Sequence, residues 1–152
     1  MEFSSIQKTD WIISPMNAII TDVRFNTFST TEVYTMKAVK KLEQLQNQFG
    51  VWTEADPAVM EAFGGMVQAS FENCAPLDAV TLELLIVAVA VARKCEPCIY
   101  SHVNSYIDAG GTREALVAGL NAALLICGGP GMAYSALALD IFDQLKEAKE
   151  QQ

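Results

Sequence analysis

Four residues that could share one chemical task lie between positions 83 and 102. The pattern is Glu83-x11-Cys95-x2-Cys98-x3-His102, and His102 is the only histidine of the chain. Thiol-disulfide chemistry needs a nucleophilic sulfur, a second sulfur that resolves the first, and groups that move protons. If these four side chains converge in space, the pattern predicts a thiol-disulfide catalyst.

The cysteine pair is expected in the first turn of a helix that begins near Cys95. Residues three and four apart lie on one helical face, so the two sulfurs can approach closely enough to bond. His102 then lies one turn below Cys98. The free N–H groups and the dipole of a first helical turn favour a thiolate. Pro97 is tolerated in a first turn and stiffens the link between the cysteines.

Glu83 can reach this site only if the chain turns back on itself. On a continuous helix it would lie about 18 Å from Cys95, at ~1.5 Å per residue. A reversal at Arg93-Lys94 would instead place Glu83 about 15 Å up one helix and His102 about 10 Å down the next. An antiparallel helix pair would therefore bring the two side chains to nearly the same level.

A relay from Glu83 through His102 to Cys98 follows from this geometry. Glu83 is a lone carboxylate in an apolar stretch, and a buried carboxylate needs a partner or a raised pKa. The alternative to the relay is a buried salt bridge, with Arg93 of a neighbouring chain or with Arg113.

Metal binding is the strongest rival to redox chemistry. Two cysteines, one histidine and one glutamate could hold zinc tetrahedrally. Redox chemistry is favoured because the two ligand pairs of a usual zinc finger are absent. Cys74 and Cys127 lie outside the motif and are interpreted as small hydrophobic residues.

Composition limits the classes of protein that need consideration. The chain has 152 residues, which suits one domain, and a net charge of −8. That acidity argues against binding to nucleic acid or to an anionic membrane surface. Four cysteines are too few for a disulfide scaffold. We find no signal peptide and no apolar run long enough to span a bilayer, so a cytoplasmic location is expected.

The chain is expected to be all-α, with an N-terminal extension over residues 1–35 and a single helical domain over residues 36–152. Caps, apolar spacing and breakers predict the helices of this domain. The first covers residues 32–49 and stops at Gly50. The second is predicted from Asp56-Pro57 to about Asn73, with close packing at Gly64-Gly65. The third begins at Pro76–Asp78 and contains a buried, central apolar run at 82–92. Three more helices are predicted from Cys95 to Gly110-Gly111, from Thr112 to about Cys127 and, after a break at 128–131, from 132 to 149.

The four-residue pattern resembles that of the alkyl hydroperoxidase D-like proteins of the carboxymuconolactone decarboxylase superfamily. The segments around it, at residues 77–85, 109–114 and 128–134, also resemble that family, and the resemblance covers roughly residues 50–145. It implies an all-α helical bundle in which an antiparallel helix pair carries the motif. It also implies assembly as a homo-trimer or homo-hexamer.

The resemblance further implies peroxidase or disulfide reductase activity without a metal or flavin cofactor. Cys98 would attack hydrogen peroxide or an organic hydroperoxide and become a sulfenic acid. Cys95, the more exposed sulfur, would close the disulfide and exchange with a reductant, while His102 and Glu83 shuttle protons. The reductant would be a dithiol or a lipoylated or thioredoxin-like protein.

One departure from the family pattern bears on these roles. The best-studied branch carries a second histidine directly before its second cysteine, where this chain has Pro97. The catalytic network therefore differs from that of the branch. Two alternatives stay open at this point: a decarboxylase of the wider superfamily that acts on a small lactone or acid, and a non-catalytic oligomeric module that binds zinc or senses redox state.

Overall fold

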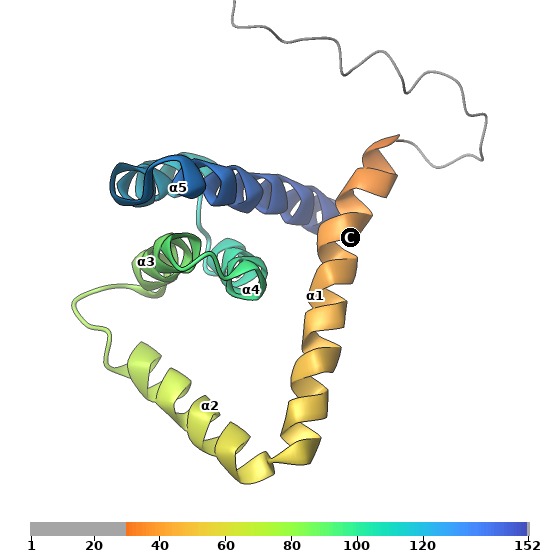
Figure 1. Cartoon of the computed structure of the whole chain (residues 1–152), viewed down its shortest axis with the longest axis vertical. Coiled ribbons are helices and arrows are strands. Elements are labelled where there is room, and N and C mark those ends of the chain that lie inside the picture. The colour runs from red at the N-terminus through yellow and green to blue at the C-terminus, as the bar shows by residue number, and fades with distance from the viewer. Residues whose placement is uncertain (1–29, 152) are drawn as a thin grey trace, which may run out of the picture.

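The computed structural model describes residues 30–151, and every regular element in that range is a helix (Figure 1). The all-α prediction is therefore confirmed. Residues 1–29 lie outside the described part, so the predicted extension is described only where residues 30–35 form the start of the first helix. The helices are α1 (Thr30–Ala55), α2 (Pro57–Glu72), α3 (Ala79–Ala92), α4 (Glu96–Asp108) and α5 (Arg113–Glu150).

The core forms where α3 and α4 pack against α5, and α1 closes one side of this group (Figure 1). Helix α3 packs against α4 and α5, whereas α5 packs against α1, α3 and α4, so the predicted central place of the 82–92 run is shared with α5. The apolar run of α3 is not buried all round as predicted: Val87 and Val91 face the core, whereas Leu85 and Val89 are about half exposed. The largest fully buried side chains of the core are Tyr106, Ile99, Leu116, Ile141, Leu145, Val87, Val91 and Val103.

Three predicted helix starts are confirmed by capping hydrogen bonds. The side chain of Asp56 accepts from the N–H of Val59 (3.2 Å), and that of Thr112 accepts from the N–H of Ala115 (3.2 Å). Asp78 accepts from the N–H of Thr81 (2.7 Å), and hydrogen bonding to Thr81 lowers the pKa of its carboxyl. Each cap satisfies a backbone donor that the first turn of a helix leaves free.

The predicted stop at Gly50 is wrong, because α1 continues through it to Ala55. A glycine inside a helix costs only about 1 kcal/mol, which its neighbours can offset. The helix ends where Pro57 excludes the helical conformation from the residue before it, and Asp56 accordingly adopts φ −146° and ψ 80°. The close packing predicted at Gly64-Gly65 is also wrong, since a Cβ at either position would meet nothing within 4 Å.

The break predicted at residues 128–131 is a kink rather than a loop. Gly128 alone leaves the helical conformation, with φ 58° and ψ −139°, and α5 resumes directly after it. Pro130 is tolerated because it falls in the first turn after the kink, where its missing N–H would have no helical partner. By length and composition alone, α5 is the one helix within residues 30–151 that could cross a membrane, a property that core helices share.

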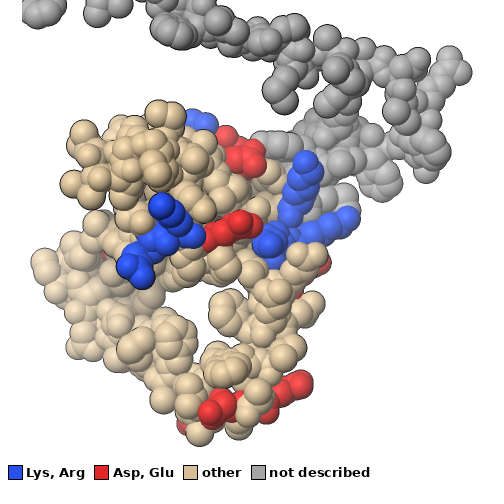
Figure 2. All heavy atoms as spheres, in the orientation of Figure 1, with Lys and Arg blue, Asp and Glu red and all other residues tan. Residues whose placement is uncertain are grey.

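Helix α2 follows the end of α1, and none of its residues is buried. The end of α1 (residues 49–55) and α2 together form what we call the α1–α2 arm. Most of its visible face carries no charge (Figure 2). Large apolar side chains are at least about one-third exposed along the end of α1 and along α2: Phe49, Val51, Trp52, Val59, Phe63, Met66 and Val67. The α1–α2 arm therefore presents apolar surface that the rest of the described chain does not cover.

A glycine between α4 and α5 supports the core. A Cβ at Gly111 would lie 2.3 Å from the ring of Tyr106, which is fully buried. The hydroxyl of Tyr106 donates to the carbonyl of Thr112 (2.9 Å) and accepts from its N–H (3.1 Å). The turn can therefore close over the ring only if residue 111 lacks a side chain.

We expect Gly111→Ala to lower the free energy of unfolding by about 1–3 kcal/mol, because the added methyl group overpacks the site against the ring. The matched control is Gly64→Ala, which adds the same methyl group in open space and should raise stability by about 0.5–1 kcal/mol. Urea unfolding of both variants at neutral pH measures the difference. A Gly111→Ala protein as stable as the wild type would contradict the packing of Tyr106.

Candidate active site

The chain reverses direction between α3 and α4, as predicted. The N–H of Arg93 donates to the carbonyl of Val89 (2.8 Å), and the N–H of Cys95 donates to that of Ala90 (3.0 Å). Lys94 between them has φ 57°, the left-handed conformation that a side chain disfavours by about 1 kcal/mol or more. Helix α4 begins at Glu96, so only residues 93–95 separate it from the end of α3.

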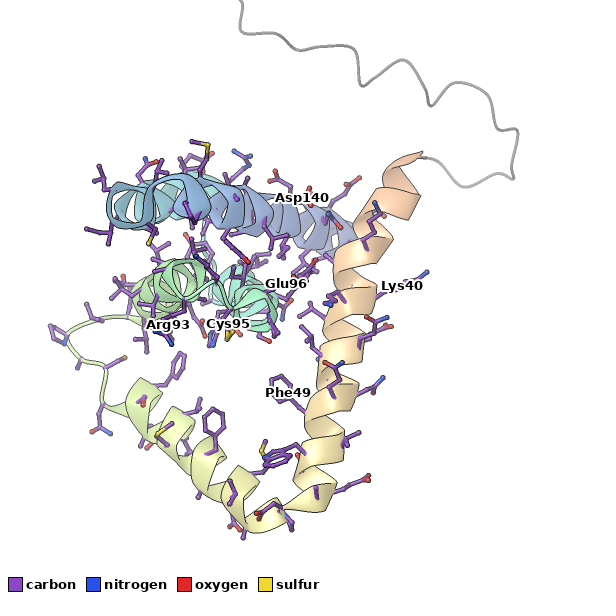
Figure 3. The ribbon with its side chains drawn as sticks, viewed as in Figure 1. Lys40, Phe49, Arg93, Cys95, Glu96 and Asp140 are labelled. Atoms are coloured by element: carbon purple, nitrogen blue, oxygen red, sulfur yellow. A yellow bond between two sulfur atoms is a disulfide. The ribbon has the colours of Figure 1, made fainter. Side chains whose placement is uncertain are left out.

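The two cysteines form a disulfide across the first turn of α4. Cys95 is the residue that precedes the helix, Cys98 lies inside it, and their Cα atoms are 5.3 Å apart. Both residues are half-buried, and Cys98 packs against the core cluster. Figure 3 shows Cys95 where α4 begins, next to Arg93 and Glu96. The disulfide therefore lies at the end of α4 where backbone N–H groups have no helical partner.

Glu83 and His102 meet across the antiparallel pair. A carboxylate oxygen of Glu83 (Oε2) lies 2.8 Å from Nδ1 of His102. Glu83 is 5% exposed, and the His102 side chain is 30% exposed. The carboxylate therefore has the partner that its burial requires, and the imidazole is held at one nitrogen. When Nδ1 carries the proton and donates to Glu83, Nε2 is the basic nitrogen that remains free.

The alternative partner for Glu83 within the chain is wrong. Arg113 forms a bidentate ion pair with Asp143, with N···O distances of 2.8 and 3.1 Å. Hydrogen bonding to Asp143, together with its charge, raises the pKa of this guanidinium. Arg113 therefore links the start of α5 to Asp143 in the second half of the same helix, and its partner is not Glu83.

Two features near the cysteines were missed from the sequence. Lys41 on α1 lies 3.7 Å from a carboxylate oxygen of Glu96, a contact between exposed side chains that contributes little to stability. Burial, with a smaller contribution from Glu96, raises the pKa of Tyr100, so its hydroxyl stays protonated at neutral pH. Neither feature has a local signal, because Lys41 comes from a distant helix and burial follows from packing.

The other cysteines lie apart from this chemistry. Cys74 and Cys127 are free and half-buried, and the thiol of Cys74 lies 3.3 Å from the carbonyl oxygen of Leu77. Within residues 30–151, no cluster of three or more His, Cys, Asp or Glu side chains is arranged to hold a metal ion. Two pairs of side chains therefore meet in this part of the described chain. Cys95 and Cys98 form the disulfide at the start of α4, and Glu83 meets His102 about one helical turn after Cys98.

The all-helical fold and the helix pair that carries Glu83 and His102 can be compared with known proteins. Residues 57–140 match the carboxymuconolactone decarboxylase family. The chain belongs to the carboxymuconolactone decarboxylase family, and the resemblance noted from the sequence is confirmed.

Two relatives support this assignment. The crystal structure of an apo carboxymuconolactone decarboxylase family protein from Legionella pneumophila is similar, with a TM-score of 0.68 and 31% sequence identity. That comparison covers 72% of this chain and 96% of the Legionella chain. An uncharacterized protein from Cupriavidus necator is 36% identical over 105 residues, which are 69% of this chain and 92% of that protein.

The buried pair makes a prediction about stability. We expect His102→Ala to lower the free energy of unfolding at neutral pH by about 1–3 kcal/mol, because the Glu83 carboxylate is left buried without its partner. Adding Glu83→Gln to that variant should recover part of the loss, since a neutral amide costs less to bury than a charge. Urea unfolding of the single and double variants measures this coupling. Equal stability of the two variants would show that His102 does not compensate the carboxylate.

Proposed function

We propose that the protein is a thiol-disulfide oxidoreductase with peroxidase activity, which reduces hydrogen peroxide or organic hydroperoxides through a Cys95–Cys98 disulfide. The observation that supports it is the disulfide in the first turn of α4, with the Glu83–His102 hydrogen bond one turn away. Membership of the family supports the fold and the superfamily. The peroxidase chemistry is the step that we add.

The reaction balances with two thiols and one hydroperoxide. The Cys98 thiolate attacks the terminal peroxide oxygen, the O–O bond breaks, and the leaving alkoxide, or hydroxide from hydrogen peroxide, takes a proton to become an alcohol or water. Cys98 is then a sulfenic acid. Cys95 attacks its sulfur, the S–S bond forms, and the hydroxide leaves as water with a second proton. An external dithiol reduces the disulfide by two exchange steps and becomes a disulfide itself.

His102 and Glu83 serve these proton movements in the proposal. The carboxylate holds Nδ1 of His102, so Nε2 can accept a proton from a thiol and return it to the leaving oxygen. His102 lies four residues after Cys98 on the same face of α4, which suits transfer directly or through one water. Since Pro97 replaces the histidine of the best-studied branch, this pair would act without a second imidazole.

The oligomeric state, the location and the reductant are also proposals. The resemblance points to a homo-trimer or homo-hexamer, and the cytoplasmic location is the expectation from the sequence. The resemblance also points to a dithiol or a lipoylated or thioredoxin-like protein as the reductant. Apolar side chains exposed on α3 and near the kink of α5, such as Val89, Leu125 and Ile126, are compatible with assembly, because subunit contacts bury such surface.

Intact mass measurement tests the disulfide cycle. One equivalent of hydroperoxide should remove the mass of two hydrogen atoms from the reduced wild-type protein, and a small dithiol should restore it. Cys98→Ser should show no such change, whereas Cys95→Ser should gain one oxygen as a trappable sulfenic acid. Cys74→Ser and Cys127→Ser are matched controls that should behave as the wild type.

Two results would overturn the proposal. Wild-type thiols that stay reduced in excess hydroperoxide would favour decarboxylation of a small lactone or acid. Stoichiometric zinc that survives dialysis and protects the thiols would favour a metal-binding module.

The proton relay makes a separate kinetic prediction. We expect Glu83→Gln to lower kcat/KM for hydroperoxide by about 10²-fold, the size of effect typical of general acid–base groups. The reason is that a neutral amide holds Nδ1 of His102 less firmly than the carboxylate does. Asp78→Asn, a change of the same kind at the exposed cap of the same helix, is the matched control and should stay near wild-type activity. Equal rates for Glu83→Gln and the wild type would remove Glu83 from the relay.

A further inference from the structure

Basic side chains flank the disulfide on a protein that is acidic as a whole. The net charge of the chain is −8, yet Arg93 and Lys94 directly precede Cys95, and both are exposed. Figure 3 shows Arg93 next to Cys95 at the start of α4. Figure 2, in the same orientation, shows basic side chains on both sides of an acidic one on this face.

The charges of Arg93 and Lys94 have no partner within the described part of the chain. Each basic side chain of α5 pairs with a carboxylate, and the pairs are Arg113–Asp143, Lys146–Glu150 and Lys149–Asp108. Among residues 30–151, neither Arg93 nor Lys94 forms such an ion pair. Their charges are therefore free to contact a second molecule.

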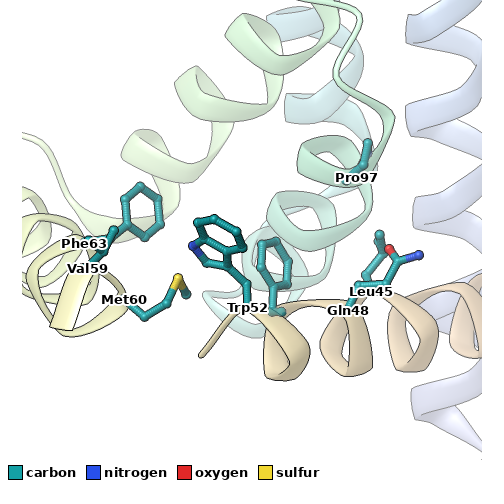
Figure 4. A pocket seen from close by; sticks show the side chains of 8 residues that line it. Leu45, Gln48, Trp52, Val59, Met60, Phe63 and Pro97 are labelled. Carbon is teal, nitrogen blue, oxygen red and sulfur yellow. The ribbon is translucent and has the colours of Figure 1, made fainter. Parts of the chain in front are cut away.

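The opposing charge at this turn is partly neutralised. Glu96 follows Cys95, and Lys41 on α1 lies 3.7 Å from its carboxylate oxygen. Pro97 lines the apolar cavity between α4 and the α1–α2 arm, and no residue that lines this cavity is charged (Figure 4). The local charge beside the disulfide is therefore positive. At physiological salt charges act over about 8 Å, so this local charge outweighs distant acidic groups for a molecule that reaches the sulfurs.

The backbone at Lys94 is a second, independent observation. Its φ of 57° is a left-handed conformation, which glycine and asparagine adopt more readily than a residue with a long side chain. Lysine therefore disfavours the turn that it occupies. A residue held in a strained conformation next to reactive groups points to a use of its side chain, and the use that fits an unpaired, exposed ammonium is contact with another molecule.

We propose that Arg93, Lys94 and Lys41 form a basic docking surface for the reductant, and that this reductant is a protein or peptide with carboxylates beside its dithiol. The inference rests on the proposed function and names the partner that restores the same disulfide to thiols. Carboxylates of the partner would contact the basic side chains while its thiols reach the sulfurs. Complementary charge of this kind raises the association rate and selects among partners.

The exchange that follows docking balances in two steps. A thiolate of the partner attacks the sulfur of Cys95, the S–S bond breaks, and Cys98 leaves as a thiolate. The second thiolate of the partner attacks the mixed disulfide, Cys95 leaves, and the partner becomes a disulfide. The partner gives up two electrons, and its two protons go to the cysteine thiolates. Cys95 is attacked first because Cys98 packs against the core cluster.

A matched pair of peptides measures the effect of charge alone. Both contain Cys-Gly-Gly-Cys, which is flanked on each side by three glutamates in one peptide and by three glutamines in the other. We would follow reduction of the oxidised protein at neutral pH and divide each rate by that of the same peptide with dipyridyl disulfide, an uncharged reagent. At physiological salt the glutamate peptide should react about 10-fold faster, a modest case of electrostatic steering. At about 1 M salt, where charges act over only about 3 Å, the two corrected rates should become equal.

Lys94→Asn separates docking from folding. Asparagine suits the left-handed turn and removes the charge, so the thermal unfolding midpoint should equal or exceed that of the wild type. The ratio of the two corrected rates should fall about 3-fold, the effect of one exposed ion pair. Adding Arg93→Gln should bring the ratio close to one. Altered reactivity of the protein's own sulfurs would affect both peptides and cancel in the ratio.

Lys146→Gln is the matched control. It removes the same charge at the other end of α4, where Lys146 lies beside Gly110 and Gly111. Its ratio of corrected rates should equal that of the wild type.

The outcomes distinguish this inference from the proposed function. Equal corrected rates for the two peptides at physiological salt, or a ratio that Lys94→Asn with Arg93→Gln leaves unchanged, would overturn the docking surface and leave the proposed function intact. A lower unfolding midpoint of Lys94→Asn would assign the lysine a structural role and overturn its part in docking. A preference for the glutamate peptide, in a protein that consumes no hydroperoxide with either peptide, would instead overturn the proposed function.

Discussion

The reversal between α3 and α4 is the constraint on which the site depends. Hydrogen bonds from Arg93 and Cys95 back into the last turn of α3 end that helix, and Lys94 adopts the left-handed conformation that turns the chain. Because both helices also contact α5, the pair cannot splay apart. The same reversal starts α4 at the cysteines and brings Glu83 to His102, so one turn positions all four groups.

The buried carboxylate links this constraint to the energetics of the core. Glu83 lies on an otherwise apolar face of α3, where an unpaired charge would cost several kcal/mol. His102 compensates that cost and is itself oriented by the contact. Gln144 is buried in a comparable way and joins α1 to α5, since its side-chain oxygen accepts from the N–H of Ala38 (3.0 Å). In both cases a buried polar group specifies which helices meet.

The molecule divides into a packed part and an arm with different physical properties. Helices α3, α4 and α5, with the first part of α1, enclose the core, whereas α2 buries no residue and leaves aromatic side chains exposed. The family match begins at residue 57, the first residue of α2, so α2 lies within the matched range and the α1 half of the arm precedes it. A cavity of about 540 Å³ lies between this arm and Pro97 of α4, the residue between the two cysteines in the motif.

The sequence by itself determined the features that arise from local interactions. Side-chain caps at Asp56, Asp78 and Thr112 act within a few residues, so the helix starts were predictable, and so was the spacing that places Cys98 and His102 on one face. Only the tertiary structure decided the passage of α1 through Gly50, the kink that keeps α5 continuous at Gly128, and the ion pair of Lys41 with Glu96. The cavity that ends at Pro97 belongs to the same group. The ion pair and the cavity depend on contacts between helices far apart in the chain, which no local pattern reports. The structure was needed at the two glycines because one glycine costs a helix only about 1 kcal/mol and does not decide by itself whether the helix ends.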